Sequence, residues 1–313
     1  MTAAERRWLS VHLPVDGRLW DDEGDRMVLD LVAPLAGLCL ERGWADRFFF
    51  LRYTAGGAHV RFRLHGPAVA LDAEVRPRLA AAAAALPGVP RWVPYEPEVE
   101  RYGGRRAVAV AEEVFDASSR LVVELVTDLA PGDRSSRLGR ALLTMLAGFH
   151  VFAGSRQETV RISRLYGEAY LRQQVPEEAS QRHLRAAYES GFGRQASALG
   201  AMVERVWEAL DGGAELPPAV ASYRRRLAWA AGRLADLHRA GRLSHRGGRY
   251  RRWRDGVTSI FPSYLHMTNN RLGVTMGEEC YLASLVATAL GGRSAVAAPT
   301  RPAVVEPAIG GHP

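Results

Sequence analysis

Two neighbouring stretches of the chain constrain its fold more than any other feature. Residues 48–53 (FFFLRY) and residues 59–64 (HVRFRL) are rich in aromatic and apolar side chains, and they flank a loop over residues 54–58 that contains two glycines. Strand-forming runs joined by a short glycine-containing loop predict a β-hairpin. We therefore expect a small antiparallel sheet in the N-terminal part of the chain.

Further elements make the region over about residues 8–104 a mixture of strands and helices. The expected elements are a strand over residues 8–13, helices over residues 25–40 and 68–86, and a strand over residues 91–95. Because proline cannot donate to a strand ladder, Pro94 and Pro97 predict that the last strand lies at a sheet edge or at a strand end.

From Arg105 onward almost every apolar pattern has helical spacing. Ser155 and Glu158 form a capping box, and Pro176 precedes two acids, so a helix is expected to begin at each place. Longer helices are expected over residues 105–129, 217–243 and 258–290, the last with a break near Gly273 or Gly277.

These patterns predict an α+β fold in which a small antiparallel sheet and its helices precede a mostly α-helical bundle. We expect a single unit over residues 1–293, mixed in its first part (about 8–104) and helical in its second part (about 105–293). The tail over residues 294–313 is rich in Ala, Pro, Val and Gly without periodicity, which predicts disorder.

Composition excludes several classes of protein. A chain of 313 residues that is 47% hydrophobic can bury a core, so it is not largely disordered. It has no run of about 18 apolar residues and no apolar signal segment at its N-terminus, so we expect a cytoplasmic protein outside the membrane. Cys39 and Cys280 cannot form a disulfide framework, and their apolar surroundings predict buried thiols.

All 41 residues counted as Lys or Arg are arginines. The absence of lysine excludes lysine-dependent covalent catalysis and P-loop nucleotide chemistry. The motifs CxxC, HExxH, GxGxxG and GxSxG are also absent, so we expect no metal and no organic cofactor. Genome bias accounts for most of the arginine usage, but the net charge of +7 indicates an acidic partner: a nucleic acid, an acidic peptide or an acidic small molecule.

The predicted strand over residues 59–64 carries the first candidate cluster. Side chains alternate along a strand, so His59, Arg61 and Arg63 share one face, while the apolar residues between them face a core. Two arginines on one rigid strand suit carboxylates. A solvated strand face is the alternative, and spacing alone favours it.

The segment over residues 95–104 (YEPEVERYGG) carries the second candidate cluster. Its acids, Glu98 among them, can bind an ammonium group or hold arginines such as Arg101 in place. Gly103 and Gly104 allow the backbone to approach a ligand or to turn into the next helix. A charged loop with a structural turn is the alternative.

Two further segments have functional and structural interpretations. One helix face is lined by Ser263, His266 and Asn270. His266 on this face is either a general acid or base, or a structural histidine whose ring nitrogens are hydrogen-bonded in the core. The run from Arg242 to Arg254 holds six arginines with Tyr250 and Trp253, which fits nucleic-acid binding, an acidic-peptide dock or a solvated loop.

Several of these segments, in this order, resemble the glutamate-elimination domain of class I lanthipeptide dehydratases. The resemblance rests on residues 48–53, 59–64, 95–104, 111–120 and 265–272 and covers about residues 8–290. The stretch PEVERYGG is its most specific part. The chain lacks the large glutamylation domain of full-length dehydratases, so it resembles a stand-alone, split version, as in thiopeptide-type biosynthesis.

The resemblance implies a lyase of peptide natural-product biosynthesis. A separate tRNA-dependent partner would glutamylate Ser or Thr of a precursor peptide with a leader, and this protein would remove glutamate to leave dehydroalanine or dehydrobutyrine. The site residues that carry over are Arg61, Arg63, Glu98, Arg101 and His266. The arginines would bind and stabilise glutamate, Glu98 would bind its ammonium or brace an arginine, and His266 would transfer the proton.

Two other functions compete with elimination. The first is a pyridine synthase, which joins two dehydroalanines in a formal [4+2] cycloaddition and releases the leader. The second is a non-catalytic adaptor that binds the precursor or tRNA through residues 242–254. We expect the leader to dock on the N-terminal sheet edge and expect no direct nucleic-acid binding. A homodimer and a complex with the glutamylating partner both stay open.

Overall fold

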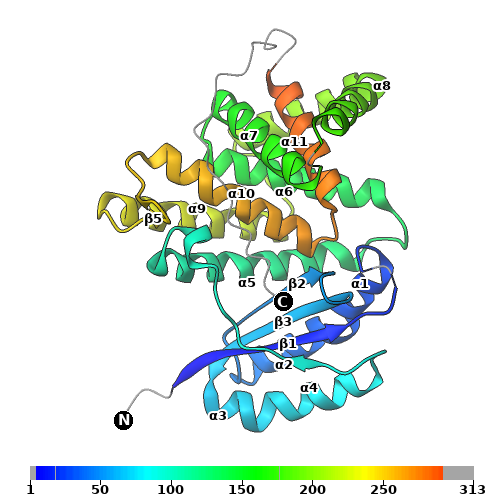
Figure 1. Cartoon of the computed structure of the whole chain (residues 1–313), viewed down its shortest axis with the longest axis vertical. Helices are drawn as coiled ribbons and strands as arrows, with labels where there is room; N and C mark the ends of the chain where they lie inside the picture. The colour runs from blue at the N-terminus through cyan, green and yellow to red at the C-terminus, as the bar shows by residue number, and fades with distance from the viewer. Residues whose placement is uncertain (1–4, 18, 176, 292–313) are drawn as a thin grey trace. The chain divides into compact units, whose positions relative to one another are not determined.

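The computed structural model describes residues 5–17, 19–175 and 177–291. The chain forms two compact units (Figure 1). The first unit comprises residues up to Pro97 with Ala111–Ala141 and Met267–Thr275, and the second comprises Glu98–Val110, Leu142–His266 and residues from Met276. The expected tail over residues 294–313 and the expected helix start at Pro176 lie outside the described residues. The single unit over residues 1–293 stays a prediction.

The first unit contains the predicted antiparallel sheet, whose strand order is β2-β3-β1-β4. The strands are β1 (Arg6–Pro14), β2 (Arg47–Tyr53), β3 (His59–Pro67) and β4 (Arg91–Trp92). Strands β2 and β3 pair from Tyr53 opposite His59, which confirms the hairpin. Strand β4 is two residues long and lies at the edge, as the two prolines after it require.

The helices of the first unit are interrupted by π-helical and 3-10 turns. They are α1 (Asp22–Arg26), η1 (Met27–Val32), α2 (Ala33–Glu41), α3 (Ala68–Ala70), η2 (Leu71–Val75), α4 (Arg76–Ala82) and η3 (Ala83–Ala85). The two predicted helices are therefore present as composite segments over residues 22–41 and 68–85. One face of the sheet supplies the core with Val11, Val60, Phe62 and Leu64, each at most 1% exposed.

A charged cluster is buried beside this core. Asp25 accepts hydrogen bonds from Arg52 at 2.5 Å and from Arg137 at 3.3 Å, and the Arg52 side chain is fully buried. Arg52 also donates to the carbonyl oxygen of Leu19. The Asn270 side chain bonds both the N–H and the carbonyl of Arg52, so Asn270 is a structural residue of this unit rather than a site residue.

The second unit is helical, as predicted. Its elements are η4 (Val99–Tyr102), α7 (Arg156–Gln174), α8 (Glu178–Asp211), α9 (Pro218–Arg239), the hairpin β5 (Ser244–His245) and β6 (Gly248–Arg249), and α11 (Met276–Gly291). Helix α11 packs against α7 and α8. Three helices divide their residues between the units, namely α5 (Arg105–Thr127), α6 (Arg134–Phe152) and α10 (Trp253–Arg271).

Several local predictions are confirmed at residue level. Ser155 caps α7 and accepts a hydrogen bond from the Glu158 N–H at 3.2 Å. The long C-terminal helix breaks at Gly273, whose φ is +76°, between α10 and α11. Cys39 and Cys280 are free and buried.

No single helix among those described is long and apolar enough to cross a membrane. Only α6 and residues 156–173 together have sufficient length and apolar composition, and these two segments are bent by 120° relative to each other.

Candidate active site

The first unit places Arg63 inside a polar and aromatic layer rather than on a solvated face. Arg63 is 9% exposed, and its Nε donates to Ser10 Oγ at 3.3 Å. Its guanidinium carbon lies 5.0 Å from the Phe49 ring and 4.8 Å from the Tyr95 ring. The alternative of a solvated face is therefore wrong for this residue. The alternation of side chains predicted that Arg63 shares a strand face with His59 and Arg61, but it did not predict which residues cover that face.

Arg61 lies on the same strand among uncharged aromatic rings. Its guanidinium carbon is 3.4 Å from the centre of the Tyr53 ring, and its Nε donates to His59 Nε2 at 3.4 Å. The His59 ring stacks on His12 at 4.6 Å. Burial, with the nearby histidine and arginines, lowers the pKa of His12 to about 3, and burial also lowers the pKa of His59. Both histidines are therefore neutral near pH 7, and the arginines carry the positive charge of this face.

The second unit holds Arg101 at three points. Its Nε donates to Ser263 Oγ at 3.0 Å, its Nη1 to Glu98 Oε2 at 3.2 Å, and its Nη2 to the Tyr170 hydroxyl at 3.4 Å. These partners come from α10, the segment before η4, and α7. The guanidinium is thus fixed in one orientation, and Glu98 occupies the bracing position that the sequence suggested for it.

His266 faces a buried carboxylate. Its Nδ1 lies 3.1 Å and 3.2 Å from the two carboxylate oxygens of Glu279, which is 1% exposed. The Tyr166 hydroxyl donates to the same carboxylate. Because an ionised carboxylate only accepts hydrogen bonds, Nδ1 carries the proton, and in the neutral ring Nε2 holds the lone pair that can accept one.

Tyr170 connects the two parts of this arrangement. Its hydroxyl contacts Arg101, while its ring lies 5.0 Å from the His266 ring and 4.8 Å from the Tyr166 ring. Burial raises the pKa of Tyr170, so its hydroxyl stays protonated at neutral pH. The structure therefore brings Glu98, Arg101 and His266 together in the second unit, and it places Arg61 and Arg63 together in the first.

Sequence reasoning missed the residues that orient His266. Glu279 lies with Leu282, Ala283 and Val286 at spacings of three, four and seven, so it occupies the buried stripe of α11. An acid in such a stripe is a signal for a buried partner, and it was available from the sequence. Tyr166 and Tyr170 are four residues apart on α7, which places both hydroxyls on one face.

The glycines of the PEVERYGG stretch are required by the turn into α5. Gly103 and Gly104 have φ values of +95° and +99°, in the left-handed region that favours glycine. A Cβ atom at Gly103 would lie 2.7 Å from the Leu243 side chain and 2.8 Å from the Ile260 side chain. The turn is therefore also packed too closely for a larger residue, and it fixes the segment that carries Arg101.

Among the described residues, no group of three or more His, Cys, Asp or Glu side chains is arranged to hold a metal ion.

Comparison with solved structures shows the fold. TsrL matches with a TM-score of 0.70 and 16% identity over 92% of this chain and 94% of its own. The pyridine synthase TbtD from thiomuracin biosynthesis matches with a TM-score of 0.71 and 17% identity over 91% of this chain and 98% of its own. The tRNA-dependent lantibiotic dehydratase MibB from Microbispora sp. 107891 matches with a TM-score of 0.61 and 21% identity over 92% of this chain but only 28% of its own.

Comparison with curated protein sequences finds no match. A family model does match, and it covers residues 8–290, nearly all of the chain. That model describes the C-terminal domain of lantibiotic biosynthesis dehydratases. The chain therefore belongs to the lantibiotic dehydratase C-terminal domain family.

Proposed function

We propose that the protein eliminates glutamate from O-glutamylated serine and threonine residues of a ribosomally made peptide. The observation that carries this proposal is the network in which Tyr170 contacts both Arg101 and His266. Elimination requires a group that accepts a proton and a cation that stabilises the negative charge formed. His266 and Arg101 supply these two functions within one unit.

In the proposed step, His266 Nε2 takes the proton from Cα of the glutamylated residue. The electron pair of that C–H bond forms the Cα=Cβ double bond, and the Cβ–O bond of the ester breaks. Glutamate leaves with the bonding electrons as a carboxylate, so the products are a dehydroamino acid, free glutamate and protonated His266. The Glu279 carboxylate stabilises the imidazolium, and Arg101 stabilises the negative charge that develops on the substrate.

We assign the remaining glutamate contacts to Arg61 and Arg63, because arginine binds carboxylates through two parallel hydrogen bonds. Glu98 braces Arg101 and has a half-exposed side chain that can also accept a bond from the glutamate ammonium. A separate tRNA-dependent enzyme would supply the glutamyl ester in the cytoplasm. This part of the proposal is supported by the structural neighbour MibB, which is a tRNA-dependent dehydratase.

A pyridine synthase is the second candidate. The structural neighbour TbtD, a pyridine synthase that matches with a TM-score of 0.71, supports this candidate. Cycloaddition of two dehydroalanines releases no glutamate and needs no residues that bind it. The arginine pair, the Glu98–Arg101 pair and His266 therefore favour elimination.

The decisive experiment supplies two substrates separately, a glutamylated linear peptide and a fully dehydrated azole-containing peptide, and follows the products by mass spectrometry. Release of glutamate supports elimination, release of the leader supports the synthase, and neither product supports an adaptor. In the elimination assay, His266→Ala should lower the rate at least about 100-fold, because a positioned acid–base group contributes about that much. The matched control is His183→Ala, at an exposed position of α8. A normal yield of dehydroamino acid from His266→Ala would reject the assignment.

A further inference from the structure

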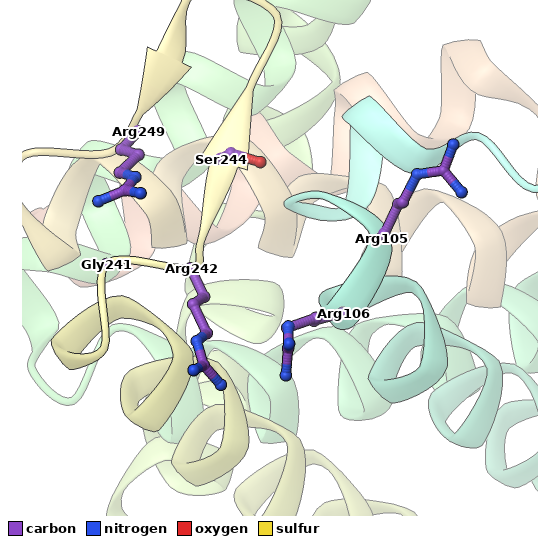
Figure 2. A pocket seen from close by; sticks show the side chains of 6 residues that line it. All are labelled: Arg105, Arg106, Gly241, Arg242, Ser244 and Arg249. Carbon is purple, nitrogen blue, oxygen red and sulfur yellow. The ribbon is translucent and has the colours of Figure 1, made fainter.

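A basic pocket lies in the second unit outside the Arg101–His266 network. It has a volume of about 320 Å³ and is lined by Arg105, Arg106, Gly241, Arg242, Ser244 and Arg249 (Figure 2). Four of the six lining residues are arginines, and all four are exposed. The pocket joins two distant parts of the sequence, because Ser244 donates its backbone N–H to the Gly103 carbonyl at 2.9 Å.

The arginines of this pocket have no acidic partner in the part of the chain that the structure describes. Within the ranges that the structure describes, no Asp or Glu forms an ion pair with any of the four, whereas Arg101, Arg156 and Arg161 elsewhere in this unit each have one. Figure 2 shows the Arg106 and Arg242 side chains directed to the same side of the pocket. Like charges held close together repel each other, and a bound anion removes that repulsion.

The backbone adds to the positive potential. Arg105 and Arg106 are the first two residues of α5, a helix of 23 residues, and the N-terminal end of a helix dipole attracts anions. Arg249 lies against the opposite wall, where a Cβ atom at Gly241 would be 3.1 Å from its Nη1. Four arginines therefore line a pocket that suits carboxylates, although Figure 2 shows the Arg105 side chain directed away from those of Arg106 and Arg242.

The position of the pocket indicates which anion it binds. Arg105 follows Arg101 by four residues, so their Cα atoms lie within about 15 Å of each other, a span of four or five residues of extended peptide. None of the six lining residues is aromatic, so the pocket itself offers no aromatic ring on which nucleic-acid bases could stack. A peptide whose reacting residue lies at Arg101 and His266 can reach the pocket with a neighbouring acidic side chain.

We propose that this pocket binds Asp or Glu side chains of the peptide substrate, near the residue that reacts. This inference rests on the proposed function in that the ligand is the peptide substrate, but it concerns binding and not elimination. It also explains the basic run over residues 242–254, which contributes three of the six lining residues, Arg242, Ser244 and Arg249.

The experiment measures binding of unreacted peptide, so that it does not depend on turnover. A short fluorescein-labelled peptide rich in glutamate is titrated with the full chain, and fluorescence anisotropy gives the Kd. The test variant is Arg106→Gln with Arg242→Gln. The matched control is Arg205→Gln with Arg225→Gln, which removes the same charge from exposed arginines of α8 and α9.

An exposed ion pair contributes up to about fivefold in affinity, and the pocket variant removes two arginines. This variant should therefore bind the peptide about tenfold more weakly than the wild type. The control variant should stay within about twofold of the wild type. The wild type should also prefer the peptide over its glutamine counterpart, and over a short single-stranded RNA at the same salt concentration. Equal loss in both variants would show non-specific attraction by net charge and would overturn the proposal. Tighter binding of the RNA, weakened by the pocket variant, would overturn it in favour of a nucleic acid.

The two failures are distinguishable. If the peptide binds the pocket but glutamate is never released from a glutamylated substrate, the proposed elimination is wrong and the binding site stands. If glutamate is released equally well by the wild type and the pocket variant, at all peptide concentrations, the elimination stands and the binding site is wrong.

Discussion

Replacing Glu279 by Gln tests whether the buried carboxylate positions and stabilises His266. Glu279 is 1% exposed and accepts hydrogen bonds from His266 Nδ1 and from the Tyr166 hydroxyl. The amide of glutamine has nearly the same shape but carries no charge. It keeps an acceptor for one of these donors and loses the attraction to an imidazolium.

The size of the effect follows from the contacts. A hydrogen bond to a charged group contributes about 1.5–3 kcal/mol, against about 1 kcal/mol for a neutral pair. The change therefore removes about 1–2 kcal/mol at the moment when His266 becomes protonated. Since about 1.4 kcal/mol corresponds to a factor of ten, kcat for glutamate elimination should fall about 5- to 30-fold. KM should change little, because a fully buried side chain cannot contact the peptide.

The assay follows dehydroamino acid formation from a glutamylated peptide by mass spectrometry over a range of peptide concentrations. Glu278→Gln is the matched control, since it makes the same change one residue earlier, at a half-buried position of α11. Thermal unfolding checks that both variants are folded. If Glu279→Gln keeps kcat within about twofold of the wild type and unfolds at the same temperature, the proposed role of the Glu279–His266 pair is refuted.

Three further predictions concern stability and the arginine of the site. Asp25→Ala leaves two guanidinium groups buried without their carboxylate, so urea titration should show a loss of about 3–5 kcal/mol, against less than about 0.5 kcal/mol for the exposed Asp30→Ala. Burial lowers the pKa of His12 from its ordinary 6.5 to about 3 in the folded protein. As the pH falls through 6.5, only the unfolded chain therefore gains this proton. The free energy of unfolding should fall by about 1–2 kcal/mol by about pH 5. The same titration on His12→Gln should give a flatter pH dependence, and an unchanged slope would show that His12 is not responsible. Arg101→Lys should lower kcat about tenfold or more, because one ammonium group cannot reproduce the three contacts of the guanidinium, and single-turnover kinetics would measure this.

The elements that the sequence predicted well are those determined by neighbouring residues. The hairpin over residues 47–67, the cap at Ser155 and the helix break at Gly273 depend on local chemistry, and each is present. In the first unit the sequence predicted two continuous helices, whereas π-helical turns interrupt both of them. Such turns change the register of side chains without leaving a signal in the apolar spacing.

The parts of the candidate site that the sequence did not show depend on contacts between distant residues. Arg63 was placed on the correct strand face, but the aromatic rings that cover it come from residue 49 on β2 and from residue 95 after β4. The contact of Glu279 with His266 joins two helices separated by the break at Gly273. Spacing arguments apply within one element, so they could suggest His266 as a candidate but could not identify the carboxylate that gives it a defined tautomer.

The arginines of this chain differ in function according to the acids around them. Arg52 and Arg137 share the buried carboxylate of Asp25, and their role is to hold the first unit together. Arg101 pairs with Glu98, whose side chain is half-exposed, and in the proposed function it stabilises negative charge on the substrate. The pocket arginines form no ion pair within the described residues, so no carboxylate in that part of the chain compensates their charge. The net charge of +7 alone therefore does not show which arginines bind a partner. The acids around each arginine distinguish those that stabilise the fold from those that we propose to bind a peptide.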